Sequence, residues 1–207
     1  TVGFKKQRAE FQDLLYHTIE RAGAQSSEQG TIVPAGVQIG GGVKAGSVYR
    51  ITEQGSVTNT GNQYDLAIEG RGFFQVLMPS GETAYTRAGN FSLNADGQLV
   101  TEDGYQIQPA ITVPNDATSI AVSKSGQVQA IRAGQTDAEI VGQIELATFV
   151  NEAGLDAIGD NLMMETAASG PANTGTPGGE GFGTLLQGYT EASNVDAVTE
   201  ITALIVA

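Results

Sequence analysis

From Val48 onward, apolar and polar residues alternate with a period of two. In "YDLAIEG", which begins at Tyr64, leucine and isoleucine alternate with aspartate, alanine and glutamate. Further runs rich in β-branched or aromatic residues follow: "FFQVLM", "QLVT", "YQIQ", "ITV", "IAV", "VQAI" and "IVGQIELATF". A period of two is that of a strand whose successive side chains face opposite sides of a sheet. The sequence therefore predicts many short strands in this region.

Short polar sequences separate these runs, namely "SGE", "NADG", "EDG", "PNDA" and "KSGQ". Their Gly, Asn, Asp and Pro residues supply the positive or fixed φ of tight turns. No helical pattern of 10–15 residues lies between the strands, so antiparallel hairpins are favoured over βαβ units. We expect a mainly β fold, an irregular antiparallel domain resembling a sandwich or barrel, with flanking helical terminal segments.

The two ends of the chain have helical patterns. Over Phe4–Tyr16, aromatic residues and leucines lie among charged residues, which fits a short amphipathic helix or an ordered approach to one. Near the other end, apolar residues alternate at spacings of three and four, as in the seam of a coiled coil: Val195, Val198, Thr202 and Ile205. Thr202 is the weak position of that seam. Ser193, with Asp196 three residues later, is predicted to cap this helix.

Two segments fit neither pattern. Tyr16–Val33, "YHTIERAGAQSSEQGTIV", is polar through its middle and too long for an ordinary connection. Such a segment predicts a functional loop, a linker, or a hairpin that rests on another surface. Ser169–Gly183, "SGPANTGTPGGEGFG", is rich in Gly and Pro and is predicted to be a linker leaving the β region.

These patterns divide the chain into five predicted regions. They are the end of an N-terminal helical region (1–15), an extended connecting region with a polar hairpin segment (16–47), an outer β domain (48–168), a Gly/Pro-rich return connection (169–192) and the start of a truncated C-terminal helix (193–207).

Composition narrows the function. The 207 residues include 10 basic and 23 acidic side chains, a net charge of −13, which argues against binding to nucleic acid or to an anionic membrane. The chain has no cysteine, so disulfides and thiolate metal sites do not hold the fold. No apolar run approaches the roughly 20 residues that span a bilayer. The start, "TVGFKKQRAEF", indicates a soluble chain that is a fragment.

Candidate sites for catalysis or ligands are weak. A single histidine, His17, is expected to be solvated or packed, and not a metal ligand. "LNADGQL", Leu93–Leu99, lacks most ligands of a calcium loop and is better interpreted as a hairpin turn. "EGRGFF", with Gly70 and Gly72, lacks the lysine or serine of a phosphate cradle and predicts a bend between two strands.

Catalytic groups are also missing from the pattern. Glu102 and Asp103 are adjacent and fit a solvated turn better than the two separated carboxylates of a glycosidase. No Gly-x-Ser-x-Gly sequence is present. We expect no enzyme activity, no cofactor, no metal and no small-molecule substrate.

An ordered set of phrases carries a more specific signal. "TVGFKKQRAEFQDLLY", "GVQIGGGV", "YDLAIEGRGFFQV", "YTRAGNFSLNADGQLVTEDGYQIQP", "FVNEAGLDAIGDNL", "ETAASG" and "SNVDAVTEI" span nearly the whole chain. In order and spacing they resemble the rod and hook proteins of the bacterial flagellum, and within that family most of all the distal rod branch. There, a segment like Tyr16–Val33 follows the N-terminal helical region and is associated with a straight, stiff tube.

The resemblance implies a structural subunit that polymerises into the rigid drive shaft carrying torque from motor to hook. It implies a coiled-coil inner layer made by both chain ends and export through the flagellar type III apparatus into the periplasm. The implied partners are further copies of the chain, proximal rod proteins, hook protein and ring bushing proteins. Candidate subunit-contact residues are Tyr16, Ile19, Gln25, Ser26, Ser27, Gln29, Ile32, Val33, Val195, Val198, Ile201 and Ile205.

Some features depart from the family, and alternatives remain. The long N-terminal helix is missing, the last helix stops at "LIVA", and Thr190 stands where relatives usually carry leucine. A proximal rod or hook protein is the nearest alternative. A secreted β-rich binding module would show exposed aromatic residues, yet the chain has no Trp and only 6% aromatics. A β-scaffold glycosidase would need a cleft with two carboxylates of different pKa.

Overall fold

The computed structural model describes residues 2–20, 37–135 and 137–206. The chain divides into two compact units, which are described separately. The hairpin unit is Gln7–Ile51, and the β unit joins Thr1–Lys6 to Thr52–Ala207. The described residues are mainly β, and every pairing between their named strands is antiparallel, as the alternating pattern predicted.

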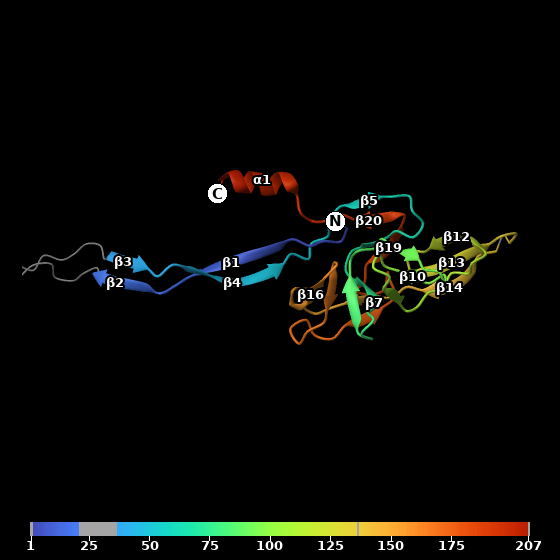
Figure 1. The fold of residues 1–207 in the computed structure, drawn as a ribbon, viewed down its shortest axis with the longest axis horizontal. Coiled ribbons are helices and arrows are strands. Elements are labelled where there is room, and N and C mark those ends of the chain that lie inside the picture. The colour runs from blue at the N-terminus through green and yellow to red at the C-terminus, as the bar shows by residue number, and fades with distance from the viewer. Residues whose placement is uncertain (1, 21–36, 136, 207) are drawn as a thin grey trace, which may run out of the picture. The chain divides into compact units, whose positions relative to one another are not determined.

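A nine-stranded sheet forms the centre of the β unit (Figure 1). Its main path runs in the order β16-β17-β8-β7-β11-β10-β9, and β15 pairs with both β7 and β18. Its strands are β7 (Phe73–Leu77), β8 (Thr83–Thr86), β9 (Ser92–Leu93), β10 (Leu99–Val100), β11 (Gln106–Gln108), β15 (Leu146–Thr148), β16 (Asp156–Gly159), β17 (Leu162–Met164) and β18 (Asn173–Gly175). This sheet is open, and not a closed barrel.

Smaller sheets complete the β unit. A three-stranded meander contains β12 (Ala117–Val122), β13 (Gln127–Arg132) and β14 (Glu139–Gln143). Two further pairs join β6 (Leu66–Glu69) to β19 (Thr184–Gln187) and β5 (Val57–Asn59) to β20 (Tyr189–Glu191). The 3₁₀ helix η1 (Glu152–Gly154) and the helix α1 (Ala197–Val206) are the described helices of this unit.

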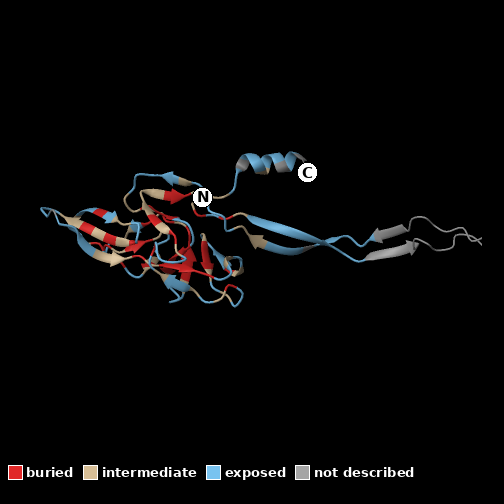
Figure 2. Ribbon diagram, turned by 180° about the vertical axis from the view of Figure 1, so that it is seen from behind, coloured by how far each residue is buried: buried red, intermediate tan, exposed pale blue. Residues whose placement is uncertain are grey.

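The main core lies between these sheets. Phe74 of β7 packs edge-to-face on Phe91, with ring centroids 5.0 Å apart, and both rings are buried. Burying a side chain of this size contributes roughly 1.5–3 kcal/mol. The other members of this cluster are Leu66, Ile68, Leu99, Ile107, Ile111, Val113, Ile120, Val128, Ile144, Leu146 and Leu185. Figure 2 shows buried residues gathered in these sheets, whereas α1 is exposed.

Several strand predictions need correction in detail. In β6, Ala67 is as buried as Leu66 and Ile68, because both faces of this strand are covered. "ITV" makes a single bridge from Thr112 to Gln98 and not a strand. "IVGQIELATF" is divided into β14 and β15, which pair in different sheets.

The hairpin unit is a ladder of two strand pairs. β1 (Gln7–Asp13) pairs with β4 (Val43–Arg50), and β2 (Tyr16–Glu20) pairs with β3 (Val37–Gly40). The helix predicted over Phe4–Tyr16 is therefore wrong. Helix nucleation is costly and a helix of this length is marginal alone, whereas the β-branched and aromatic residues of β4 provide a strand partner.

The predicted linker Ser169–Gly183 is also wrong, because this segment belongs to the β unit. β18 pairs along its length with β15, and Ser169 is fully buried. Gly175 lies so close to the Phe182 ring that a Cβ atom there would be 2.5 Å from it. The small residues that suggested a flexible connection instead allow close packing.

Candidate functional site

α1 begins with a side-chain cap. Asp196 Oδ1 accepts a hydrogen bond from the Val198 amide at 2.9 Å, and Asp196 Oδ2 accepts one from the Thr199 hydroxyl at 3.0 Å. These bonds, first of all that from the Val198 amide, hold the pKa of Asp196 below its usual 3.8. The expected cap at Ser193 is wrong, because its hydroxyl accepts from the Val195 amide before the helix starts. Aspartate is itself a good N-cap, so the helix starts after Asp196.

The large apolar side chains described in and just before α1 are exposed. Val198 is 73% and Ile205 79% exposed, and the other predicted contacts Val195 and Ile201 are exposed too. Leu204, which was not among the predicted contacts, is as exposed as Ile205. Thr202 donates its hydroxyl to the Val198 carbonyl oxygen at 2.8 Å, so this polar residue of the seam is satisfied within its own helix. The helix thus presents an uncovered apolar surface.

The hairpin unit contains the other predicted contacts. Tyr16 and Ile19 lie in β2, whereas Gln25, Ser26, Ser27, Gln29, Ile32 and Val33 lie outside the described residues. All of β1 is exposed, and Phe11 is 69% exposed. Val43 and Val48 of β4 are exposed as well. A two-stranded ribbon whose described side chains are this exposed is marginally stable by itself.

The two chain ends meet inside the β unit. Val2 and Ala192 form an antiparallel bridge, and the Gly3 amide donates to the Glu191 carbonyl oxygen at 2.9 Å. One step further out, the Lys6 amide donates to Asn194 Oδ1 at 2.7 Å. The Lys6 ammonium group pairs with the Glu200 carboxylate of α1. Residues from the start of the chain therefore run beside those that lead into α1.

A buried ionic cluster lies under this meeting point. Glu191 of β20 is fully buried, and the side chains of Lys5 and Arg87 are nearly so. Lys5 Nζ lies 2.5 Å from Glu191 Oε1, and the Arg87 guanidinium lies 2.8 Å from Glu191 Oε2. Burial lowers the pKa of Lys5 below 10.5, and the hydrogen bond to Glu191 opposes that effect. No local pattern in the sequence indicates this cluster, because its residues are far apart along the chain.

The weak ligand motifs form local structure. In "LNADGQL", Asn94 Oδ1 accepts hydrogen bonds from the Asp96 and Gln98 amides, which confirms the hairpin turn. In "EGRGFF", Gly70 and Gly72 have positive φ and form the predicted bend between β6 and β7. Their carbonyl oxygens accept hydrogen bonds from Arg87.

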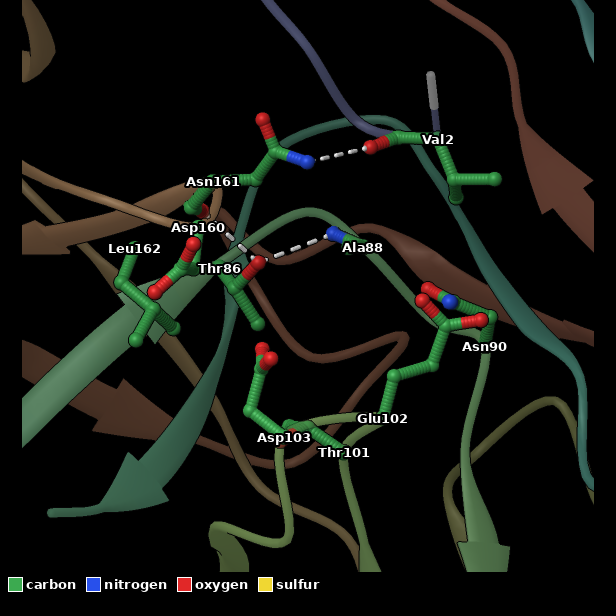
Figure 3. A pocket seen from close by; sticks show the side chains of 10 residues that line it. All are labelled: Val2, Thr86, Ala88, Asn90, Thr101, Glu102, Asp103, Asp160, Asn161 and Leu162. Atoms are coloured by element: carbon green, nitrogen blue, oxygen red, sulfur yellow. Dashed lines mark hydrogen bonds between the residues drawn. The ribbon is translucent and has the colours of Figure 1, made fainter.

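A polar pocket of about 310 Å³ opens beside the first residues (Figure 3). Glu102 and Asp103 lie in a turn at its edge, and Asp160 adds a third carboxylate. Asn161 donates to the Val2 carbonyl oxygen at 3.1 Å and accepts from the Thr86 hydroxyl through its own carbonyl oxygen. Among the described residues, no group of three or more acidic, histidine or cysteine side chains is arranged to hold a metal ion.

None of the described helices is long and apolar enough to cross a bilayer.

Two family models match the chain. One is described as the flagellar hook protein FlgE/F/G D1 domain and matches residues 67–130. The other is described as the flagellar basal body rod FlgEFG protein C-terminal and matches residues 186–207.

Several known proteins are similar to this chain over its whole length. The flagellar basal-body rod protein FlgG of Caulobacter vibrioides is 70% identical over all of this chain and 79% of its own length. FlgG of Agrobacterium fabrum is 47% identical, again over 100% of this chain and 79% of that protein. The basal-body rod protein FlgF of Caulobacter vibrioides is 35% identical over 99% of this chain and 75% of its length. The chain therefore belongs to the FlgG family of flagellar basal-body rod proteins.

Proposed function

We propose that this chain is a structural subunit of the flagellar distal rod, which polymerises into a rigid tube that carries torque from the motor to the hook. The observation that carries this proposal is the 70% identity to a FlgG protein over the whole chain. The FlgF protein of Caulobacter vibrioides is 35% identical to this chain, half the identity of that organism's FlgG, which favours the FlgG role over that of another rod protein.

The exposed apolar residues support a polymer. A helix in which Val198, Ile201, Leu204 and Ile205 face solvent is marginal alone, because the stability of short helices comes from packing. We propose that α1 joins the N-terminal helical region of the family in a coiled-coil inner layer, with Val195, Val198, Ile201 and Ile205 in the contact. Repeating heterologous contacts of this kind build an open helical array and not a closed ring.

The hairpin unit suits lateral contacts. β1 and β4 form a two-stranded sheet, and edge strands of this kind present backbone donors and acceptors that a further strand can pair with. Phe11, Val43 and Val48 are exposed on this ribbon. We propose that Tyr16–Val33 continues this ribbon and contacts neighbouring subunits through Tyr16, Ile19, Gln25, Ser26, Ser27, Gln29, Ile32 and Val33. The strands of the β unit would then form the outer domain, with residues 48–168 as its main part, 16–47 as the connecting region and 193–207 as the start of the inner helix. The helical role predicted for 1–15 and the linker role predicted for 169–192 are not retained.

The surroundings follow from the same proposal. The subunit would be exported by the flagellar type III apparatus and assemble in the periplasmic part of the basal body. It would contact its own copies, proximal rod proteins below, the hook protein above and the ring bushing proteins around it. The relatives are named as rod proteins, so a structural role and not catalysis is proposed.

Genetic exchange tests the proposal. In Caulobacter vibrioides, the matching part of FlgG is replaced by this chain, and swimming in soft agar and isolated basal bodies are examined. We expect swimming to be restored to at least half of the parental rate. The same exchange into FlgF is the matched control and should fail. Rescue of the FlgF strain alone, or of neither strain, would contradict the distal-rod assignment.

A further inference from the structure

We infer that Glu191 is a positioning residue whose buried ionic cluster holds residues 2–6 and the segment leading to α1 against the rest of the β unit. The inference deepens the proposed function, because a rod subunit must carry force between its terminal segments and its β domain. Nothing in the similarity to rod proteins assigns a role to this residue.

Both carboxylate oxygens of Glu191 accept hydrogen bonds. Oε1 accepts from Lys5 Nζ at 2.5 Å and from the Gly55 amide at 2.9 Å. Oε2 accepts from Arg87 Nε at 2.9 Å, with a second guanidinium nitrogen at 2.8 Å. One side chain therefore binds three segments that are 104 to 186 residues away along the sequence.

The two cations extend these contacts into the body of the fold. Lys5 Nζ also donates to the Glu53 carbonyl oxygen at 2.8 Å. Arg87, just after β8, donates to the Gly70 and Gly72 carbonyl oxygens at 2.8 and 2.7 Å. Arg87 thereby links Glu191 to the bend between β6 and β7, beside the main core. The cluster connects the first residues of the chain, its last strand and the central sheet.

Close backbone packing completes the clamp. Gly55 lies so near to Ala192 that a Cβ atom on it would be 1.9 Å from the Ala192 carbonyl oxygen. The Ala192 amide donates to the Ser56 carbonyl oxygen at 2.8 Å. The chain that leads from β20 to α1 is thus held on one side by residues 55–56 and on the other by residues 2–6.

The chemistry explains why a charged cluster serves as a clamp. A buried ion pair contributes little net stability, because desolvation offsets the attraction, but loss of one partner leaves an uncompensated buried charge. Such a cluster therefore disfavours every arrangement in which the three groups are apart. It fixes the direction of both chain ends more strongly than it stabilises the fold as a whole.

Amide hydrogen exchange on the chain tests the inference. Glu191→Gln and Lys5→Met are compared with the unsubstituted chain at the amides of Gly3, Gly55 and Ala192. We expect both variants to increase exchange at these amides at least tenfold more than at the amides of β7 and β8. Lys6→Met removes the partly exposed ion pair with Glu200 and is the matched control. It should change exchange at the amides of Gly3, Gly55 and Ala192 less than threefold.

Two results would overturn the inference. Unchanged exchange at Gly3 and Ala192 in both variants would show that backbone pairing alone holds the ends. Equal acceleration throughout the β unit in both variants would show that the cluster stabilises the fold generally. The exchange experiment and the swimming experiment can fail independently. If the unsubstituted chain did not restore swimming, the rod role would be contradicted, but the exchange measurements would be unaffected.

Discussion

Gly89 shows how closely single residues are fitted in the β unit. The Leu66 amide donates to the Gly89 carbonyl oxygen, and a Cβ atom on Gly89 would lie 1.6 Å from the Leu66 carbonyl oxygen. We expect Gly89→Ala to lower the free energy of unfolding by about 3 kcal/mol or more, because β6 or Phe74 must move. Chemical denaturation measures this loss.

Gly81 is the matched control for that substitution. It has a positive φ of 88°, but a Cβ atom there would meet nothing within 4 Å. We expect Gly81→Ala to cost only the roughly 1–2 kcal/mol of a left-handed backbone. An equal loss for the two variants would contradict the close packing described for Gly89.

Asp196 makes the start of α1 dependent on pH. Its pKa is lowered in the folded chain, so it stays ionised at pH values where the unfolded chain is already protonated. Its stabilising effect is therefore fully present above the usual value of 3.8 and is lost as the pH falls through the lowered pKa. We expect the Val198 amide resonance to shift in that acidic range. Asp196→Asn keeps the cap without a titrating group, and an unchanged titration in this variant would exclude Asp196 as the cause.

The ionic cluster of Lys5, Arg87 and Glu191 could not be predicted from the sequence, because it depends on contacts between distant segments. Local periodicity shows which face of a strand is buried, but it does not show which distant charge will meet Glu191. Lys5 and Arg87 are ordinary basic residues in the sequence, and only the folded chain brings them to one carboxylate. Ser193 and Asp196 are both good N-cap residues, so the sequence alone does not show which of them starts the helix.

At the scale of elements, substitutions on the exposed face of α1 should impair assembly without lowering the stability of the subunit. Ile201 and Ile205 are exposed, so we expect the double substitution Ile201→Ser and Ile205→Ser to change the free energy of unfolding by about 0.5 kcal/mol or less. In a Caulobacter vibrioides strain whose FlgG has its matching part replaced by this chain, the same two substitutions should reduce swimming at least tenfold. Thermal unfolding and soft-agar assays measure the two effects.

Phe74→Ala is the comparison for that experiment. This ring is fully buried in the main core, and its loss should cost roughly 3–5 kcal/mol. If the helix substitutions destabilised the chain as much as Phe74→Ala, the apolar face of α1 would be packed within the subunit and would not be free for contacts.

Strands and turns were predicted better than helices and connections. Alternation and turn residues located β6, β7, β10, β11, β12 and β13, because these signals are local. Phe4–Tyr16 was assigned wrongly, since its pattern fits two periods and the strand partner Val43–Arg50 lies 30 or more residues away. Ser169–Gly183 was assigned wrongly because glycine signals close packing as well as flexibility.

At the scale of the whole molecule, the charge is unevenly shared. Residues 7–51 contain four basic and four acidic side chains, so the β unit carries the entire net charge of −13. Copies of this unit therefore repel one another at low ionic strength. The mainly β class was readable from the alternating pattern, but the strand order of the nine-stranded sheet was not, because its neighbours come from distant parts of the sequence.

Salt should therefore promote assembly. The screening length falls from about 30 Å at 0.01 M salt to about 10 Å at 0.1 M. For FlgG that carries this chain, we expect polymerisation followed by light scattering to be several-fold faster at 0.1 M than at 0.01 M salt. Slower polymerisation at the higher concentration would show that attractive ion pairs, and not apolar and hydrogen-bonded contacts, drive the assembly.

Electron microscopy of basal bodies tests the central claim most directly. They are isolated from Caulobacter vibrioides whose FlgG carries this chain, and from a strain in which Tyr16–Val33 is also deleted. We expect a straight rod that reaches the hook in the first strain, and a curved or missing distal rod in the second. A basal body that lacks its distal rod in the first strain would contradict the assignment as a rod subunit, and a straight rod in both would contradict the role of the segment.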